Sequence, residues 1–279
     1  MRITLHQPNY LPWIGFFHKL SLCDGIVLLD HVQYEKNGPG NRNEIKGPNG
    51  AVRLTVPVRG KGRFGQTVAE VEIDQTSGWS ARHWKSLSQA YARSDHFAEH
   101  APFFEALYAR SWVKLALLNE EIIQYLAGAF GLKPRTWRSS ELAASGAKTE
   151  MLVGLCRAVG ATECLTGTGS REYLDPAVFT ASGIGHRFHR FRHPIYPQSH
   201  GAFVSHLSAV DLLFHAGPAA ADVLRQCEEE ENGGGGADGG ESGSGRQDSG
   251  AEVRAEVSEG REPTPRLETT AGKEETRCK

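Results

Sequence analysis

Apolar and polar positions in the first 200 residues follow a pattern that predicts alternating strands and helices. Short apolar runs at 3–5 and 25–29 flank a segment, 14–22, whose apolar residues fit a buried helix. Further elements are an extended run at 136–139, a helix at 149–159, and strands at 163–166 and 185–191. This order predicts an α/β fold with a Rossmann-like parallel sheet.

Two other segments break this alternation. Residues 42–74 have strand-like alternation at 52–56 and 68–73 on either side of a basic, Gly-rich loop, which predicts a β-hairpin insertion. Residues 79–130 predict a helical subregion of three helices, broken near Asp95 and Ser111. A last helix is expected at 203–214.

The chain changes character at Glu228. Residues 228–279 contain no aromatic residue and three sizeable aliphatic ones, too few to offset the entropy cost of ordering. We therefore expect one α/β domain at 1–227 and a disordered acidic tail, rich in Gly, Ser and Glu, at 228–279.

Separating the tail changes the charge of the body. The tail holds 14 Asp plus Glu and 7 Lys plus Arg, which leaves 19 acids and 24 bases in residues 1–227, a net charge of +5. A basic body attracts anionic ligands, and the tail would compete for the same surface. The bases are spread out and form no known nucleic-acid motif, so nucleic acid is not the expected partner.

Cysteine content and hydropathy favour a cytoplasmic protein. The five cysteines are odd in number and form no CxxC pair, which indicates neither a disulfide framework nor a thiolate zinc site. No apolar run approaches the roughly 20 residues of a membrane-spanning helix. No signal peptide is evident at the N-terminus.

The loop after the first strand carries the densest candidate chemistry. Pro8 and Pro12 stiffen it, Gly15 permits close approach of a ligand, and His6 is a candidate acid or base. Open α/β sheets hold ligands beyond the carboxyl ends of their strands. The ligand-binding candidates here are Gln7, Asn9, Tyr10, Trp13, Gly15 and Lys19. A Pro-rich turn followed by a capped helix would explain the same residues.

Three further segments offer ligand contacts. After the strand at 163–166, a glycine-rich turn with a hydroxyl and a guanidinium suits phosphate or carboxylate, or is an ordinary turn capped by Ser170. A loop at 193–200 repeats the composition of the opening loop, and we expect the two to form opposite walls of one pocket; the alternative is that both loops are structural. The residues in question are Gly167, Gly169, Ser170, Arg171, His193, Tyr196 and Gln198, with Arg42 and Asn43 at the start of the insertion.

Several established chemistries have no signature in this chain. Its twelve histidines form no HExxH or comparable spacing, so no metal site is predicted. There is no GxSxG elbow and no recognised cysteine nucleophile, which disfavours covalent catalysis.

Four motifs together resemble the WbqC-like protein family over about residues 2–226. They are HQPNYLPWIGFFHK at 6–19, NRN at 41–43, TGTGSREYLD at 166–175 and HPIYPQSHGAFVSHLSAVDLLF at 193–214. Family members occur in bacterial gene clusters for O-antigen, other glycans or specialised metabolites, and the resemblance adds Tyr173 to the binding candidates. The opening also looks distantly like nucleotidyltransferases, in which Gly-His begins the helix, but here Phe16 follows Gly15.

These observations favour a transferase acting on an activated, anionic small molecule, such as a nucleotide-linked sugar or an amino-acid-like precursor. Lys19, Arg42, Ser170 and Arg171 would hold phosphate or carboxylate, while His6 or His193 moves a proton. No cofactor is specified, although a nucleotide fits this chemistry. The alternative is a non-catalytic ligand-binding or scaffold protein with protein partners in a biosynthetic complex.

Overall fold

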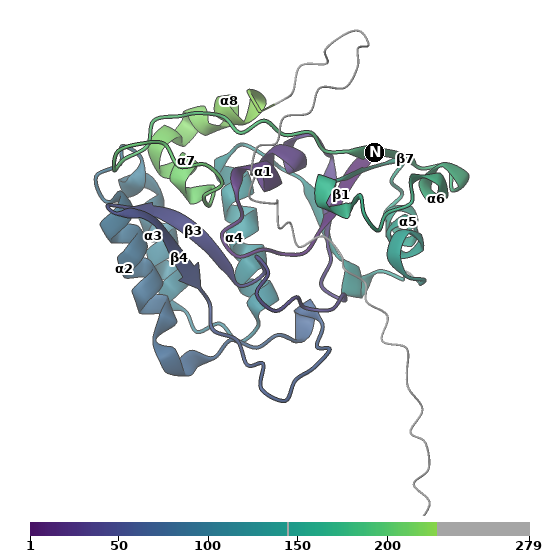
Figure 1. The fold of residues 1–279 in the computed structure, drawn as a ribbon, viewed down its shortest axis with the longest axis horizontal. Coiled ribbons are helices and arrows are strands. Elements are labelled where there is room, and N and C mark those ends of the chain that lie inside the picture. Colours follow the sequence, from purple (N-terminus) through teal and green to yellow (C-terminus); the bar gives the residue numbers. More distant parts are fainter. Residues whose placement is uncertain (144, 228–279) are drawn as a thin grey trace, which may run out of the picture.

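A five-stranded parallel sheet forms the centre of the fold. The computed structural model describes residues 1–143 and 145–227, so the predicted tail at 228–279 lies outside the described residues. The strand order is β5-β2-β1-β6-β7 (Figure 1). The strands are β1 (Arg2–His6), β2 (Gly25–Leu28), β5 (Arg135–Arg138), β6 (Glu163–Thr166) and β7 (Gly185–Phe188). The chain order therefore reverses between β1 and β6, as at the switch point of a Rossmann-like sheet.

Helices cover both faces of this sheet. Ile26 and Leu28 of β2 belong to the core that includes α1 (Ile14–Ser21) and α4 (Leu115–Ala129). Val27 and Leu29 point the other way, into the core that includes α5 (Lys148–Ala158) and α6 (Pro176–Ala181). Alternate residues of a strand face opposite sides of its sheet, so a continuous apolar run is what a strand between two helical layers requires.

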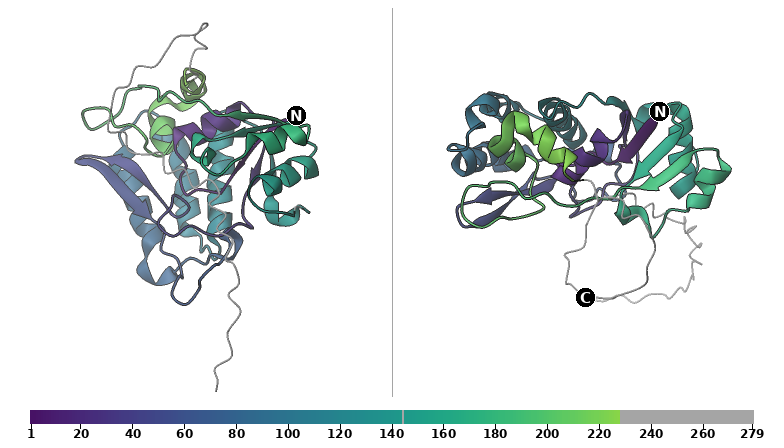
Figure 2. Two further views of the ribbon diagram at one scale, coloured as in Figure 1. Left: turned by 45° about the vertical axis from the view of Figure 1, so that its right-hand side comes forward. Right: turned by 90° about the horizontal axis from the view of Figure 1, so that it is seen from above.

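The insertion forms a hairpin from a different pair of segments than predicted. Strand β3 (Arg42–Gly47) pairs antiparallel with β4 (Gly50–Thr55), whereas residues 68–70 form the 3-10 helix η1 (Val68–Glu70). Thr67 and Glu70 form a capping box that favours this turn over a strand. The hairpin lies at the end of the molecule away from β7 and α6 in every view (Figures 1 and 2).

The helical subregion has the predicted three helices, but the C-terminal helix is shorter than expected. Helices α2 (Trp79–Tyr91) and α3 (Phe97–Ala109) precede α4. The predicted helix at 203–214 begins later, as α7 (Val210–Ala216), and is followed by α8 (Ala220–Arg225). Ser208 and Ala209 donate their backbone N–H groups to Glu44 and Pro12 carbonyls instead of to a preceding helical turn.

The predicted strand at 185–191 ends at Phe188, and the turn after β6 does not lead directly into a helix. That turn is a three-residue 3-10 helix, η4 (Thr168–Ser170), and α6 starts only at Pro176, where Asp175 caps it. Within the described parts of the chain, no helix has the length and apolar character needed to cross a membrane.

Candidate functional site

A pocket of about 290 Å³ lies at the reversal of strand order, beside the carboxyl ends of β1 and β6. Its lining comes from the end of β1, the start of α1, the turn after β6 and the segments after β7. The lining residues are His6, Trp13, Gly15, Phe16, Lys19, Gly167, Thr168, Gly169, Arg171, His189, Arg190, Phe191 and His206. We call this the switch-point pocket.

The lining of the switch-point pocket is positively charged. Lys19, Arg171 and Arg190 contribute three cations, and none of the lining residues is a carboxylate. Lys19 is 3% exposed, whereas Arg171 and Arg190 are exposed, so positive charge extends from the buried part of the pocket to its rim. The Arg171 guanidinium also lies over the Phe188 ring, 4.9 Å from its centroid. This arrangement favours an anionic ligand.

His6 is held in one orientation at the end of β1. Its Nδ1 lies 2.7 Å from the Gln7 carbonyl oxygen, which accepts hydrogen bonds only, so Nδ1 carries a proton. When the ring is neutral, Nε2 is therefore the nitrogen with the lone pair. The ring also makes an edge contact with Phe16 at a centroid distance of 4.9 Å. An imidazole oriented in this way is suited to accept a proton through Nε2.

A second imidazole, that of His189, is held neutral. Its Nε2 lies 2.8 Å from Nδ1 of His18, and both rings are buried. Burial lowers the pKa of His189 to about 3, and the nearby charge of Lys19 lowers it further. His189 is therefore uncharged near neutral pH, so it contributes hydrogen bonding to the pocket and no positive charge.

Aromatic rings form one wall of the pocket. The Trp13 indole stacks on His206 at 5.4 Å and meets the edge of Phe191 at 4.8 Å. A Cβ added to Gly15 would lie 2.4 Å from the indole, so this packing requires glycine. His206 has φ 61°, a left-handed conformation that is costly for a residue other than glycine. The stacked wall offers a flat surface for a planar or apolar part of a ligand.

The comparisons agree with the four motifs. The sequence model of the WbqC-like protein family matches residues 7–223, most of the chain. The chain belongs to the WbqC-like protein family. It is 35% identical over 230 residues to Uncharacterized protein Rv1507c of Mycobacterium tuberculosis (strain ATCC 25618 / H37Rv), covering 82% of this chain and 99% of that protein. No solved structure matches the chain.

The structure of this WbqC-like protein brings some of the predicted site residues together in the switch-point pocket. These are His6, Trp13, Gly15, Lys19, Gly167, Gly169 and Arg171. Sequence reasoning missed Phe16, Thr168, His189, Arg190, Phe191 and His206. His189, Arg190 and Phe191 directly follow β7, at the strand end where such sheets bind ligands, but the strand predicted at 185–191 included them and so concealed this signal.

His193 lies behind the pocket wall. Its Nδ1 donates to the Pro194 carbonyl at 2.8 Å, and its Nε2 accepts the backbone N–H of His206 at 3.0 Å. Burial lowers its pKa, which favours the neutral ring that this pairing needs. With both nitrogens bound to backbone groups, His193 fixes the position of His206 in this structure.

Tyr196 and Gln198 belong to a buried polar network. Tyr196 Oη and Gln198 Nε2 both donate to Oδ2 of Asp211, at 2.9 and 2.7 Å, and Tyr91 Oη donates to its Oδ1 at 2.9 Å. Asp211 is fully buried, and hydrogen bonds of this kind offset the desolvation of its carboxylate. These residues connect the loop at 193–200 to α7 and do not line the pocket.

The other candidates in the opening loop are buried outside the switch-point pocket. Tyr10 is fully buried, with its hydroxyl 2.8 Å from Nδ1 of His83, and Gln7 and Asn9 are also buried outside the pocket lining. Asn119 of α4 donates to the carbonyls of Pro8 and Gly40, at 2.8 and 2.7 Å.

Arg42, Asn43, Ser170 and Tyr173 do not line the switch-point pocket either. Arg42 donates to the Asn37 side chain, and Asn43 donates to the Leu11 carbonyl at 2.5 Å. Ser170 donates to the Gly167 carbonyl within the short η4 turn. Tyr173 packs against the core around α5 and α6. Among the residues that the structure describes, no three His, Cys, Asp or Glu side chains gather as metal ligands would.

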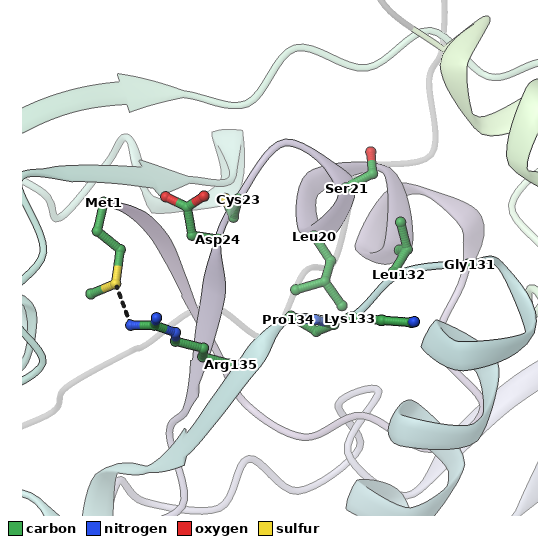
Figure 3. A pocket seen from close by; sticks show the side chains of 10 residues that line it. All are labelled: Met1, Leu20, Ser21, Cys23, Asp24, Gly131, Leu132, Lys133, Pro134 and Arg135. Carbon is green, nitrogen blue, oxygen red and sulfur yellow. Dashed lines mark hydrogen bonds between the residues drawn. The ribbon is translucent and has the colours of Figure 1, made fainter.

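A larger cavity of about 570 Å³ lies at the opposite, amino-terminal edge of the sheet (Figure 3). Arg135 and Met1 meet across it, with 3.9 Å between Nη1 and Sδ. The Cys23 thiol lines this cavity, but burial raises its pKa to about 12, so it remains protonated near neutral pH. The cavity lies away from the strand ends that bind ligands in such sheets.

Proposed function

We propose that this WbqC-like protein is a transferase whose switch-point pocket binds an activated small molecule through a phosphate or carboxylate group. The three cations of the pocket, with no carboxylate in its lining, are the observation that carries the proposal. A volume of about 290 Å³ suits the anionic part of a ligand better than a whole nucleotide sugar, since pockets for drug-sized ligands span roughly 300–1,000 Å³.

In the proposed reaction, Lys19, Arg171 and Arg190 neutralise the anionic donor. A hydroxyl or amine of the acceptor forms a bond to the activated atom of the donor, and the bond to the leaving group breaks. The electron pair of that bond departs with the leaving group, where the cations stabilise it. Nε2 of His6 takes the proton that the acceptor loses. The proposal includes a pathway context, glycan or specialised-metabolite synthesis, which membership of the WbqC-like family supports.

The anion site is tested by ligand titration. Nucleotides, nucleotide sugars, sugar phosphates and amino acids are screened by thermal shift, because a ligand that binds only the native state raises the unfolding midpoint. The variants Arg171→Gln and Arg190→Gln are expected to weaken the best ligand about tenfold or more. Arg187→Gln is the matched control, since Arg187 is 70% exposed, pairs with Glu163 and does not line the pocket.

If a stabilising anion binds all three variants as tightly as it binds the unaltered protein, the switch-point pocket is not its binding site and the proposal is wrong. The catalytic role is separated from binding by His6→Ala. If the protein is a transferase, this variant retains ligand affinity and loses turnover. Turnover equal to that of the unaltered protein would contradict the role of His6 and favour the alternative, a ligand-binding protein of a biosynthetic complex.

A further inference from the structure

A second pocket of about 260 Å³ lies at the same edge of the sheet, over β2 and β5. Pro8, Leu28 and Leu117 contribute apolar surface, and Leu117 is 44% exposed. Asp30 and Ser140, which follow β2 and β5, contribute polar groups. We call this cavity the β2–β5 pocket.

The two pockets are adjacent across one pair of strands. His6 lines the switch-point pocket, Leu28 lines the β2–β5 pocket, and these two residues are register partners in β1 and β2. Neighbouring strands lie about 4.8 Å apart. Pro8, two residues after His6, lines the β2–β5 pocket, so the opening loop contributes to both cavities.

Most charges around the β2–β5 pocket are already paired. Arg138 binds the carboxylates of Glu120 and Glu141, with N–O distances of 2.8 and 3.2 Å. The Lys114 ammonium donates to the Glu70 carbonyl at 3.0 Å and lies 3.9 Å from the Glu72 carboxylate. These pairs reduce the attraction of the pocket for a carboxylate or phosphate.

Asp30 has a different environment. Asp30 is 5% exposed, and its carboxylate accepts from the hydroxyls of Ser139 and Ser140, at 2.9 and 2.6 Å, and from the backbone N–H of Ser140 at 2.8 Å. Each of these donors is neutral. The buried negative charge is therefore hydrogen-bonded while its field still favours a cation in the adjoining cavity.

We propose that the β2–β5 pocket binds a small molecule with an apolar body and a primary ammonium group. The ammonium donates to Asp30, and the apolar body lies against Leu28 and Leu117. This binding does not depend on the switch-point pocket. The further step, in which the bound ammonium first loses a proton to solvent and the resulting amine is the acceptor of the transfer reaction, does rest on the proposed function, because the two pockets share the opening loop.

The test uses n-butylamine, with n-butanol and butyrate as neutral and anionic probes of similar length. Each is titrated into the full chain while amide resonances are followed by NMR. We expect n-butylamine to shift resonances at residues 28–30, 116–117 and 138–141 and to bind at least about tenfold more tightly than either control. Equal binding of the three probes, or n-butylamine shifts elsewhere only, would overturn the proposal.

Two variants locate the charge. Asp30→Asn keeps an oxygen to accept from Ser139 and can donate to the Ser140 hydroxyl, so the fold is expected to survive while n-butylamine affinity falls about tenfold. Leu117→Lys places a cation at the partly exposed mouth and should weaken n-butylamine similarly. Its control is Val113→Lys, since Val113 is 64% exposed and does not line the pocket. Unchanged affinity in both Asp30→Asn and Leu117→Lys would overturn the proposal, whatever ligand the switch-point pocket binds.

Discussion

The substitution Gly15→Ala probes the tightest contact in the candidate site. Gly15 is the second residue of α1, and a Cβ there would lie 2.4 Å from two carbons of the Trp13 ring. Since ordinary contacts begin near 3.4 Å, the indole has to move by about 1 Å. That movement disturbs its contacts with Phe191 and His206, which form the aromatic wall.

The size of the effect follows from two opposing contributions. Each of the two ring contacts of Trp13 is worth about 0.5–1.5 kcal/mol, so disturbing both costs about 1–3 kcal/mol. Alanine in place of glycine stabilises a helix by about 1 kcal/mol. We therefore expect Gly15→Ala to lower the free energy of unfolding by about 0–2 kcal/mol, although helix propensity alone predicts an increase.

Gly128→Ala is the matched control. Gly128 is the second-last residue of α4, and a Cβ there meets nothing within 4 Å. Urea denaturation should show it to be more stable than Gly15→Ala by about 1–3 kcal/mol. Anion affinity, measured by titration, should fall about tenfold in Gly15→Ala and remain unchanged in Gly128→Ala. Two equally stabilised variants with unchanged affinity would refute the assigned packing of Trp13.

Three further predictions concern the loop, the pH response and the tail. Asn119→Leu leaves the carbonyl of Pro8, in the opening loop, and the carbonyl of Gly40, just before β3, without their donor and should cost about 2–4 kcal/mol in urea denaturation; a cost below about 0.5 kcal/mol would contradict this account. Because the pKa of His189 is about 3 in the folded protein and near 6.5 ordinarily, its contribution to stability is complete above pH 6.5 and falls as the pH drops toward 3. His189→Gln should flatten the pH dependence of unfolding by up to about 1.4 kcal/mol per pH unit, and an unchanged slope would refute it. The Cys227 carbonyl accepts the N–H of Arg192 at 3.0 Å, and Arg192 directly follows Phe191 of the pocket lining, so the described part of the chain reaches Cys227 close to the pocket. Deleting residues 228–279 should tighten phosphate binding at low ionic strength and have no effect at about 0.5 M salt, whereas equal affinities at low salt would exclude competition by the tail.

The sheet was predictable because its apolar runs have a physical signature that does not depend on distant residues. Ile26 to Leu29 are buried on alternate sides, so the segment reads as continuously apolar. The hairpin was harder, because alternation identifies a strand but not its partner. Thr67 and Glu70 did carry a local signal, the spacing of a capping box, which argued against a strand at 68–73.

The candidate site was only partly predictable, because part of its lining comes from segments that are distant in sequence and meet only through the order of the strands in the sheet. His189 and Phe191 have no motif of their own and reach His6 because β7 lies beside β6, which lies beside β1. The resemblance in composition between the loop at 193–200 and the opening loop was also an incomplete guide. The side chains of Tyr196 and Gln198 bind a buried carboxylate, which no local pattern in either loop indicates.

Several polar residues of the family motifs therefore act on the backbone around the pocket. Asn43 donates to the carbonyl of Leu11, which has φ 44°, and His193 accepts the N–H of His206, which has φ 61°. Each left-handed residue costs roughly 1–3 kcal/mol and persists only where its surroundings hold it. Of the two strained residues, Leu11 lies two positions before Trp13, and His206 is itself part of the aromatic wall. Loss of either hydrogen bond should consequently change ligand affinity without removing any group that contacts the ligand, which distinguishes these residues from Lys19, Arg171 and Arg190.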